Sequence, residues 1–404
     1  MKHRAKLVMF LIMLASCIAC DRRAGAAPQA GHLTCEYRVD PIGIDTIVPR
    51  LGWWVESAAR GEMQTAYQVL VASSPEKLGS EEGDLWDTGR VASGQNVHVV
   101  YRGKTLQPGQ RCWWKVRIWG RDPTASDWSD TSTWQIALLR DADWSARWVG
   151  PEPTDKPNQG STLLRKRFTL PKAVKHATAS VCGLGWFELH VNRTKAGNHV
   201  LAPPNSRYGR RVLFDTLDIT DSLQTGENAV GVFLGNGYDS EYSRWGWKFA
   251  DSRRAIVQID VEYQDGTRDR IVSDDTWSMA AGPITFCGIY SGETCDAREK
   301  APGWATAAFD DSHWQPVALV PGPGGVLQAN TMPPIRVVET IRPVAVTEPR
   351  SGVFVFDMGQ NFAGWTRLRV NGNSGTTVTL RHSELVGEDG NIDPWTNRNA
   401  KATD

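Results

Sequence analysis

The sequence lacks the motifs that mark several enzyme classes. Its eight histidines are scattered and form no His-Glu-x-x-His pair, so metal-dependent catalysis is not indicated. No Gly-x-Ser-x-Gly elbow is present, which argues against a serine hydrolase. The chain also has no excess charge of either sign, because 45 basic residues balance 45 acidic residues. This balance gives no reason to expect nucleic acid or an anionic membrane surface as a partner.

Long helical periodicity is missing too. No stretch repeats apolar residues convincingly every 3.6 positions, so an all-helical domain is not expected. The 404 residues instead include 38 glycines, 22 prolines and 18 tryptophans, a composition that favours short strands and turns in two to four domains. We therefore predict an all-β chain of tandem β-sandwiches: a fibronectin-III-like sandwich, then a jelly roll, then part of a further sandwich.

Residues 1–20 have the pattern of an export signal. Basic residues at the start precede an apolar centre at 7–14, and small residues follow. The stretch 14–17, Leu-Ala-Ser-Cys, has the form of a lipobox and predicts lipidation at Cys17, with Cys20 as a weaker candidate. We expect an exported periplasmic or outer-membrane lipoprotein that meets the membrane only through this anchor. Ordinary secretion is the alternative.

Cysteine use beyond the signal predicts no metal site. The five cysteines there match no Cys-x-x-Cys metal-binding spacing, and their number is odd. Cys287 and Cys295 are the only plausible local disulfide pair, which an exported protein could form.

Turn punctuation divides the mature chain. A small-residue tether at 21–32 precedes alternating strands over 33–140, including 67–72 and 112–119, which predict the fibronectin-III-like sandwich. Strands over 141–320, among them an alternating run at 255–263, predict the jelly roll. The Gly- and Pro-rich segment 321–336 is typical of a linker, and 337–404 carries further strand patterns at 353–356, 365–370 and 376–381 that predict a partial β-sandwich.

The stretch 234–247 is the densest knot of turn glycines and aromatics in the chain. A buried-strand pattern at 229–234 runs into Gly-Asn-Gly and then into a loop that mixes rings with polar side chains. Sugars offer apolar C–H faces to rings and hydroxyls to polar groups, so this stretch predicts a carbohydrate site. The alternative is a loop whose aromatics cap the core. The candidate contacts are Asn236, Tyr238, Asp239, Trp245 and Trp247.

An ordered series of motifs resembles the N-terminal half of bacterial α-L-rhamnosidases, which are inverting glycoside hydrolases. The motifs are Tyr37 with 49–53 (PRLGW), 85–90 (LWDTGR), 201–203 (LAP) with Tyr208 and Arg211, 234–237 (LGNG), 292–293 (GE) with 296–298 (DAR), 333–336 (PPIR) and 356–365 (FDMGQNFAGW). Each motif alone is weak, but the series covers nearly all of the mature chain.

The resemblance implies a fibronectin-like sandwich, a jelly roll related to carbohydrate-binding modules, a further β-sandwich and then an (α/α)₆ barrel with the catalytic carboxylates. We expect that barrel to be absent from this sequence, so that no residue here inherits a catalytic role. It also implies that Tyr208 and Arg211 contact carbohydrate, and that rhamnose-containing glycans and a separate catalytic domain are partners.

Adjacent carboxylates at 274–275, 310–311 and 388–389 do not form the pair that inversion needs. Inverting enzymes hold two carboxyl groups on either side of the scissile bond with room for a water. Each of these pairs lies in a turn-like context, and neighbouring side chains in a strand point to opposite faces. We expect solvated turn residues at all three places.

Glu293, Asp296 and Arg298 form a more informative cluster. The carboxylates predict either oxygen ligands for Ca²⁺ or hydrogen-bond partners for a sugar. The alternative is an ionic network that ties two loops together.

Three functions remain open on the sequence. The first is the non-catalytic N-terminal portion of an α-L-rhamnosidase-like enzyme, with carbohydrate binding. The second is a stand-alone surface lipoprotein that captures glycans. The third is a β-sandwich spacer that binds no sugar.

Overall fold

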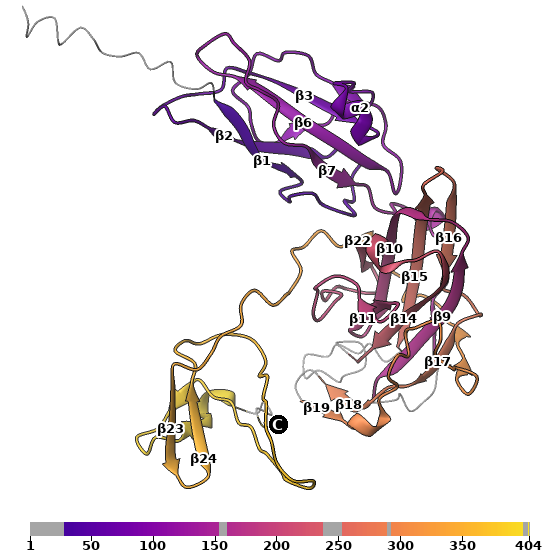
Figure 1. Ribbon diagram of the computed structural model, residues 1–404, viewed down its shortest axis with the longest axis vertical. Coiled ribbons are helices and arrows are strands. Elements are labelled where there is room, and N and C mark those ends of the chain that lie inside the picture. The colour runs from indigo at the N-terminus through magenta and orange to yellow at the C-terminus, as the bar shows by residue number, and fades with distance from the viewer. Residues whose placement is uncertain (1–27, 153–159, 237–252, 289–291, 399–402, 404) are drawn as a thin grey trace, which may run out of the picture. The chain divides into compact units, whose positions relative to one another are not determined.

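The computed structural model describes residues 28–152, 160–236, 253–288, 292–398 and 403, and nearly all of its regular elements are strands (Figure 1). The chain divides into two compact units, Met1–Ile136 and Ala137–Asp404. Tandem β-sandwiches, the predicted fold class, are confirmed. Within the described residues, no helix is both long and apolar enough to cross a bilayer.

The first unit contains two sheets and one short helix. The three-stranded sheet has the order β1-β2-β5 and the four-stranded sheet the order β4-β3-β6-β7. The elements are β1 (Gln29–Cys35), β2 (Arg50–Glu56), β3 (Ala66–Ala72), α2 (Pro75–Gly79), β4 (Trp86–Asp87), β5 (Val99–Val100), β6 (Arg111–Trp119) and β7 (Ser132–Gln135).

Aromatic rings fill the core of this first unit. Trp114, Val116 and Ile118 alternate along β6 and are fully buried, as the sequence pattern predicts. The Trp114 and Trp134 rings meet edge to face with centroids 6.2 Å apart, a favourable geometry for aromatic pairs. Buried Trp53 donates its indole N–H to Gln64 Oε1 at 2.8 Å, so its polar atom is satisfied inside the core.

Two larger sheets build the sandwich of the second unit. One has the order β21-β8-β15-β10-β13-β22, with β16 also pairing β15, and the other has the order β12-β11-β14-β9-β17-β20. The elements up to residue 263 are η1 (Asp141–Asp143), β8 (Val149–Gly150), β9 (Thr162–Leu170), β10 (Val174–Leu184), β11 (Phe187–Val191), β12 (Thr194–Lys195), β13 (Arg211–Asp218), η2 (Thr220–Ser222), β14 (Gly226–Leu234) and β15 (Arg254–Tyr263).

Shorter elements complete this unit. A hairpin of β18 and β19 stands apart from the two large sheets, and β23 pairs only with β24. The elements are β16 (Arg268–Val272), β17 (Ser278–Ala281), β18 (Ile284–Gly288), β19 (Gly292–Cys295), η3 (Ala297–Glu299), β20 (Gln315–Pro316), β21 (Ala318–Leu319), β22 (Val326–Ala329), β23 (Ala345–Arg350), β24 (Val353–Asp357), β25 (Leu385–Val386), β26 (Ile392–Asp393) and η4 (Pro394–Asn397).

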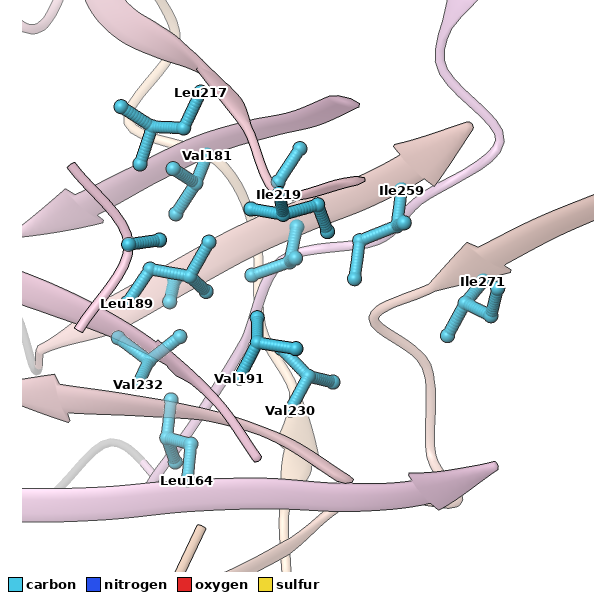
Figure 2. Packing of buried hydrophobic residues seen from close by; sticks show 14 of the residues in the cluster. Leu164, Val181, Leu189, Val191, Leu217, Ile219, Val230, Val232, Ile259 and Ile271 are labelled. Atoms are coloured by element: carbon cyan, nitrogen blue, oxygen red, sulfur yellow. The ribbon is translucent and has the colours of Figure 1, made fainter. Parts of the chain in front are cut away.

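The apolar layer between the two large sheets holds the sandwich together. Val257, Ile259 and Val261 point from β15 into this layer, because alternate residues of a strand share one face. Figure 2 shows the layer, with Val181 and Ile259 from one sheet and Leu164, Val230 and Val232 from the other. Burial of this surface is the main stabilising contribution to the jelly roll.

Three expectations from the sequence differ from the structure. Inside the expected linker, Val326–Ala329 forms the four-residue strand β22, which pairs in parallel with β13. The open edge of the sheet at β13 accepts this short strand despite the glycines before it. Residues 365–370 and 376–380 form no strand, since an alternating pattern needs a neighbouring strand and the described residues supply none to them. Cys287 lies opposite Glu293 and Cys295 opposite Ile284, so the two thiols are offset along the hairpin and are not bridged.

A buried arginine fastens the segment 304–314 to β9. The Arg165 side chain is fully buried and pairs with Asp311, while its Nε and Nη2 donate to the carbonyls of Trp304 and Thr306, both at 2.8 Å. Its guanidinium also lies 5.4 Å from the ring centroid of Phe309. Asp311 is therefore not the solvated turn residue that the sequence predicted, because burial of the arginine requires a paired anion.

We expect replacement of Asp311 by Ala to destabilise the second unit by about 3–5 kcal/mol, because it leaves the Arg165 charge buried without its carboxylate. Urea unfolding and hydrogen exchange over 304–314 measure the effect. Asp310→Ala is the matched control, since the Asp310 carboxylate is exposed and accepts only from Ser312. Equal unfolding midpoints for the two variants would contradict the assignment.

Candidate functional site

Several strands of the jelly roll end at the same edge of the sandwich. β10 ends at Leu184, β14 at Leu234 and β18 at Gly288, and β13 begins at Arg211. The chain then enters residues 237–252, which lie outside the described part and which hold Tyr238, Asp239, Trp245 and Trp247. Four of the ten predicted sugar contacts thus lie outside the described residues, and these four stay a prediction.

A glycine makes the close approach at this edge possible. Gly185 has a φ of 101°, and a Cβ built on it would lie 2.0 Å from the carbonyl oxygen of Gly235. No side chain fits there, so the turn after β10 can lie directly against the turn after β14. Gly235 in turn donates its N–H to the Trp186 carbonyl at 2.7 Å.

Asn236 ties this turn to the β18–β19 hairpin. Its side chain is 4% exposed, and Nδ2 donates to the carbonyl of Cys287 at 2.7 Å. Cys287 is the cross-strand partner of Glu293 in the hairpin. Asn236 therefore contacts the hairpin at the residue pair that includes Glu293. In this position Asn236 orients the start of the loop, since a buried amide that is hydrogen-bonded to a carbonyl fixes the backbone around it.

Tyr208 and Arg211 lie at the same edge but on the other sheet. Tyr208 is 2% exposed and packs in a cluster with Leu184 and Phe214, so its ring is covered by protein. Arg211 is exposed at the start of β13, and its carbonyl accepts from the hydroxyl of Ser206 at 2.8 Å. Of these two predicted contacts, only Arg211 presents a side chain to solvent.

Asp296 and Arg298 form a local pair at the far end of the hairpin. Asp296 accepts from the backbone N–H of Arg298 at 3.0 Å and pairs with its guanidinium, and the Arg298 side chain is exposed. The pair caps η3 and does not connect two loops, which corrects the expected network. In the described part of the chain, no group of three or more His, Cys, Asp or Glu side chains could hold a metal ion. Glu293 and Asp296, the carboxylates of the Ca²⁺ alternative, therefore belong to no such group.

Sequence reasoning missed a charged cluster beside this edge. Glu188, one residue into β11, accepts from Lys195 Nζ at 2.6 Å and contacts His190 Nε2 at 3.2 Å. The His190 hydrogen bond and the Lys195 ammonium lower the pKa of Glu188 to about 2, although partial burial opposes the shift. Two features of the sequence could have indicated this cluster. Glu188 and His190 are two residues apart and so share one face of a strand, and a tight turn before Lys195 brings that lysine back beside them.

This edge presents backbone turns, the exposed Arg211 guanidinium and the Glu188 carboxylate, which already accepts from Lys195. Sites of that kind recognise hydroxyl-rich molecules, because each hydroxyl needs both a donor and an acceptor. The described carboxylates are mostly committed to partners: Asp274 to Lys166, Asp311 to Arg165 and Glu188 to Lys195.

Three family models match the chain in order. They are described as a Rha78A-like, N-terminal immunoglobulin domain at residues 30–140, an alpha-L-rhamnosidase N-terminal domain at 172–339 and a bacterial alpha-L-rhamnosidase concanavalin-like domain at 347–404. The chain belongs to the bacterial α-L-rhamnosidase family. The resemblance to the N-terminal half of α-L-rhamnosidases is thus confirmed.

Curated α-L-rhamnosidases match over almost the whole chain. One from Formosa agariphila is 30% identical over 96% of this chain and 44% of its own length. Another, from Streptomyces avermitilis, is 29% identical over 91% of this chain and 52% of its own length. The chain spans about half the length of the curated relatives it matches.

Solved α-L-rhamnosidase structures share the fold. The structure from Dictyoglumus thermophilum has a TM-score of 0.83 and 37% identity, over 93% of this chain and 44% of that chain. The Streptomyces avermitilis structure, described as complexed with L-rhamnose, has a TM-score of 0.84 and 28% identity, over 94% of this chain and 53% of that chain.

We expect the Glu188 cluster of this rhamnosidase family member to give a pH-dependent stability. Folding lowers the pKa of Glu188 from 4.5 to about 2. Its contribution to the free energy of unfolding is therefore complete above pH 4.5 and is lost as the pH falls towards 2. Glu188→Gln should cost about 1 kcal/mol at pH 7, a value reduced by solvent screening because the side chain is 40% exposed.

Urea unfolding of both proteins from pH 7 down to pH 3 checks this expectation. The difference in unfolding free energy should narrow below pH 4.5. Lys195→Met should show the same narrowing with a smaller amplitude, because His190 remains. A difference that stays constant with pH would contradict the cluster.

Proposed function

We propose that the chain is the non-catalytic N-terminal portion of an enzyme that removes terminal α-L-rhamnose, and that its jelly roll binds rhamnose-containing glycans. The single observation that carries this proposal is the ordered match of three rhamnosidase domain models, which leaves the chain at about half the length of its relatives. A separate catalytic domain is then the partner of this chain.

The geometry at the edge of the jelly roll supports carbohydrate binding. Asn236 and the Gly185–Gly235 contact fix the backbone that leads into residues 237–252. That stretch carries Tyr238, Trp245 and Trp247, and aromatic rings held by rigid strands are suited to stacking on sugar faces. A relative of the same fold was solved with L-rhamnose, which supports the choice of sugar.

Calorimetric titration of the purified chain with L-rhamnose tests the binding, beside a hydrolysis assay on a chromogenic α-L-rhamnoside. We expect binding without hydrolysis, and we expect Trp245→Ala and Trp247→Ala each to weaken the affinity about tenfold through lost stacking. Tyr208→Phe is the control, because the Tyr208 ring is buried in the core.

Two outcomes contradict the proposal in different ways. Hydrolysis would show that this chain carries catalytic carboxylates of its own. Silence in both assays would favour a spacer without sugar binding. Repeating the titration with Ca²⁺ added and then chelated tests whether a cation contributes; unchanged affinity would exclude it.

We also infer that the chain is exported and held at a membrane surface through a lipid on Cys17. The support is the basic start, the apolar stretch at 7–14 and the small residues before Cys17.

Replacement of Cys17 by Ala should move the protein from the membrane fraction to the soluble periplasmic or secreted fraction, because the attachment cysteine is lost. Fractionation and metabolic labelling with a fatty-acid analogue measure this change. Cys20→Ala is the matched control and should leave the protein in the membrane fraction. Labelling that survives in the Cys17 variant would contradict the assignment.

A further inference from the structure

The outer face of the β1-β2-β5 sheet in the first unit presents two exposed rings. Arg50 and Trp54 both point outward from β2, because they are four residues apart on one strand. Trp54 is 60% exposed, and Tyr37, which follows β1, is 66% exposed. Neither ring belongs to the aromatic core, and neither is used by the site in the jelly roll.

Each ring is held on one side by a neighbouring side chain. His32 stacks on Trp54 with ring centroids 4.0 Å apart and an interplanar angle of 29°. The Arg50 guanidinium lies over the Tyr37 ring at 5.0 Å, and the Tyr37 hydroxyl meets His98 Nε2 at 2.7 Å. Since one face of each ring is covered and the side chains remain largely exposed, the other faces are open to solvent.

Three of the residues on this face have backbone conformations that are costly for residues other than glycine. His32, Tyr37 and His98 have φ values of 46°, 64° and 57°, in the left-handed region that favours glycine. Such conformations persist only where surrounding contacts hold them, and they occur often at functional sites. Tyr37 and both histidines adopt such conformations, whereas Trp54 does not.

Val97 lies between the two rings and completes a row with them. Gly52 lies midway between Arg50 and Trp54, and a Cβ built on it would lie 3.0 Å from Thr34 Oγ1, 3.6 Å from the Asn96 carbonyl oxygen and 3.8 Å from the Cα of Val97. The Val97 side chain is exposed, as is that of Val100 beside Arg50. Four residues of strand separate Arg50 from Trp54 by about 13 Å. The row is therefore long enough for several rings of an extended sugar chain.

Polar groups border this row. Glu36 pairs with Arg50, and the Tyr37 hydroxyl accepts from Arg50 Nη1 at 3.3 Å. Carboxylate, guanidinium, imidazole and phenol together supply donors and acceptors for hydroxyls. The paired charges leave the surface near neutral, which suits an uncharged ligand better than a charged one. Ordered rings also reduce the conformational entropy lost on binding.

We propose that the face formed by His32, Tyr37, Arg50, Trp54, Val97 and His98 is a second carbohydrate-binding surface, which takes an extended polysaccharide chain. The chain lies along the row with its C–H faces on Trp54, Val97 and Tyr37. This surface would hold the protein on a polymer while the jelly roll binds a terminal sugar.

Affinity electrophoresis of the full chain in gels containing a soluble, uncharged rhamnose polymer tests the proposal. We expect the wild-type chain to be retarded, and we expect Trp54→Ala and Tyr37→Ala each to weaken retardation about tenfold, because each removes one stacking ring. Trp54→Phe should restore most of it. Trp395→Ala is the matched control, since Trp395 is 66% exposed and lies in the second unit.

Calorimetry with free L-rhamnose separates this surface from the proposed jelly-roll site. Trp54→Ala should leave rhamnose affinity unchanged, whereas Trp245→Ala should weaken rhamnose affinity and leave most of the polymer retardation. A wild-type chain that is not retarded, or Trp54 and Tyr37 variants that are retarded like wild type, would overturn the proposal. The second result is also the one expected if the face docks a polypeptide.

Discussion

The apolar layer between the two large sheets of the jelly roll is the constraint on which the remaining structure depends. Val257, Ile259 and Val261 in β15 face Val230 and Val232 in β14 across that layer. A shift of one residue in any of these strands would turn apolar side chains to solvent. Register is therefore fixed, and with it the positions at which β10 and β14 end. The candidate site is a consequence of those strand ends.

Turn chemistry then decides how closely the loops at this edge meet. The approach of Gly185 to the carbonyl of Gly235 leaves no room for a side chain. Asn236 adds a buried hydrogen bond to the β18–β19 hairpin. Rigid supports of this kind suit a binding loop, because the frame is ordered before any ligand arrives. In the sheet that contains β9 and β14, Arg165 pairs with Asp311 and holds the segment 304–314 in place.

Family membership and ligand binding depend on different features of this protein. Family membership follows from matches in order along the chain, whereas ligand binding rests on the arrangement of side chains. The first unit illustrates this separation, because its core tryptophans explain the fold and its outward Trp54 does not. An exposed ring that is held by a stacked imidazole is a feature of the surface and not of packing.

The sequence by itself determined the all-β class, because alternation and turn residues act over short distances, and its ordered motifs carried the resemblance to the family. Strands such as 112–119 and 255–263 could be predicted for that reason. Only the tertiary structure decided that Tyr208 is covered, that Asp311 neutralises Arg165 from 146 positions away, and that β22 lies in the expected linker. Each of these outcomes depends on which distant segment lies alongside, and no local pattern records that.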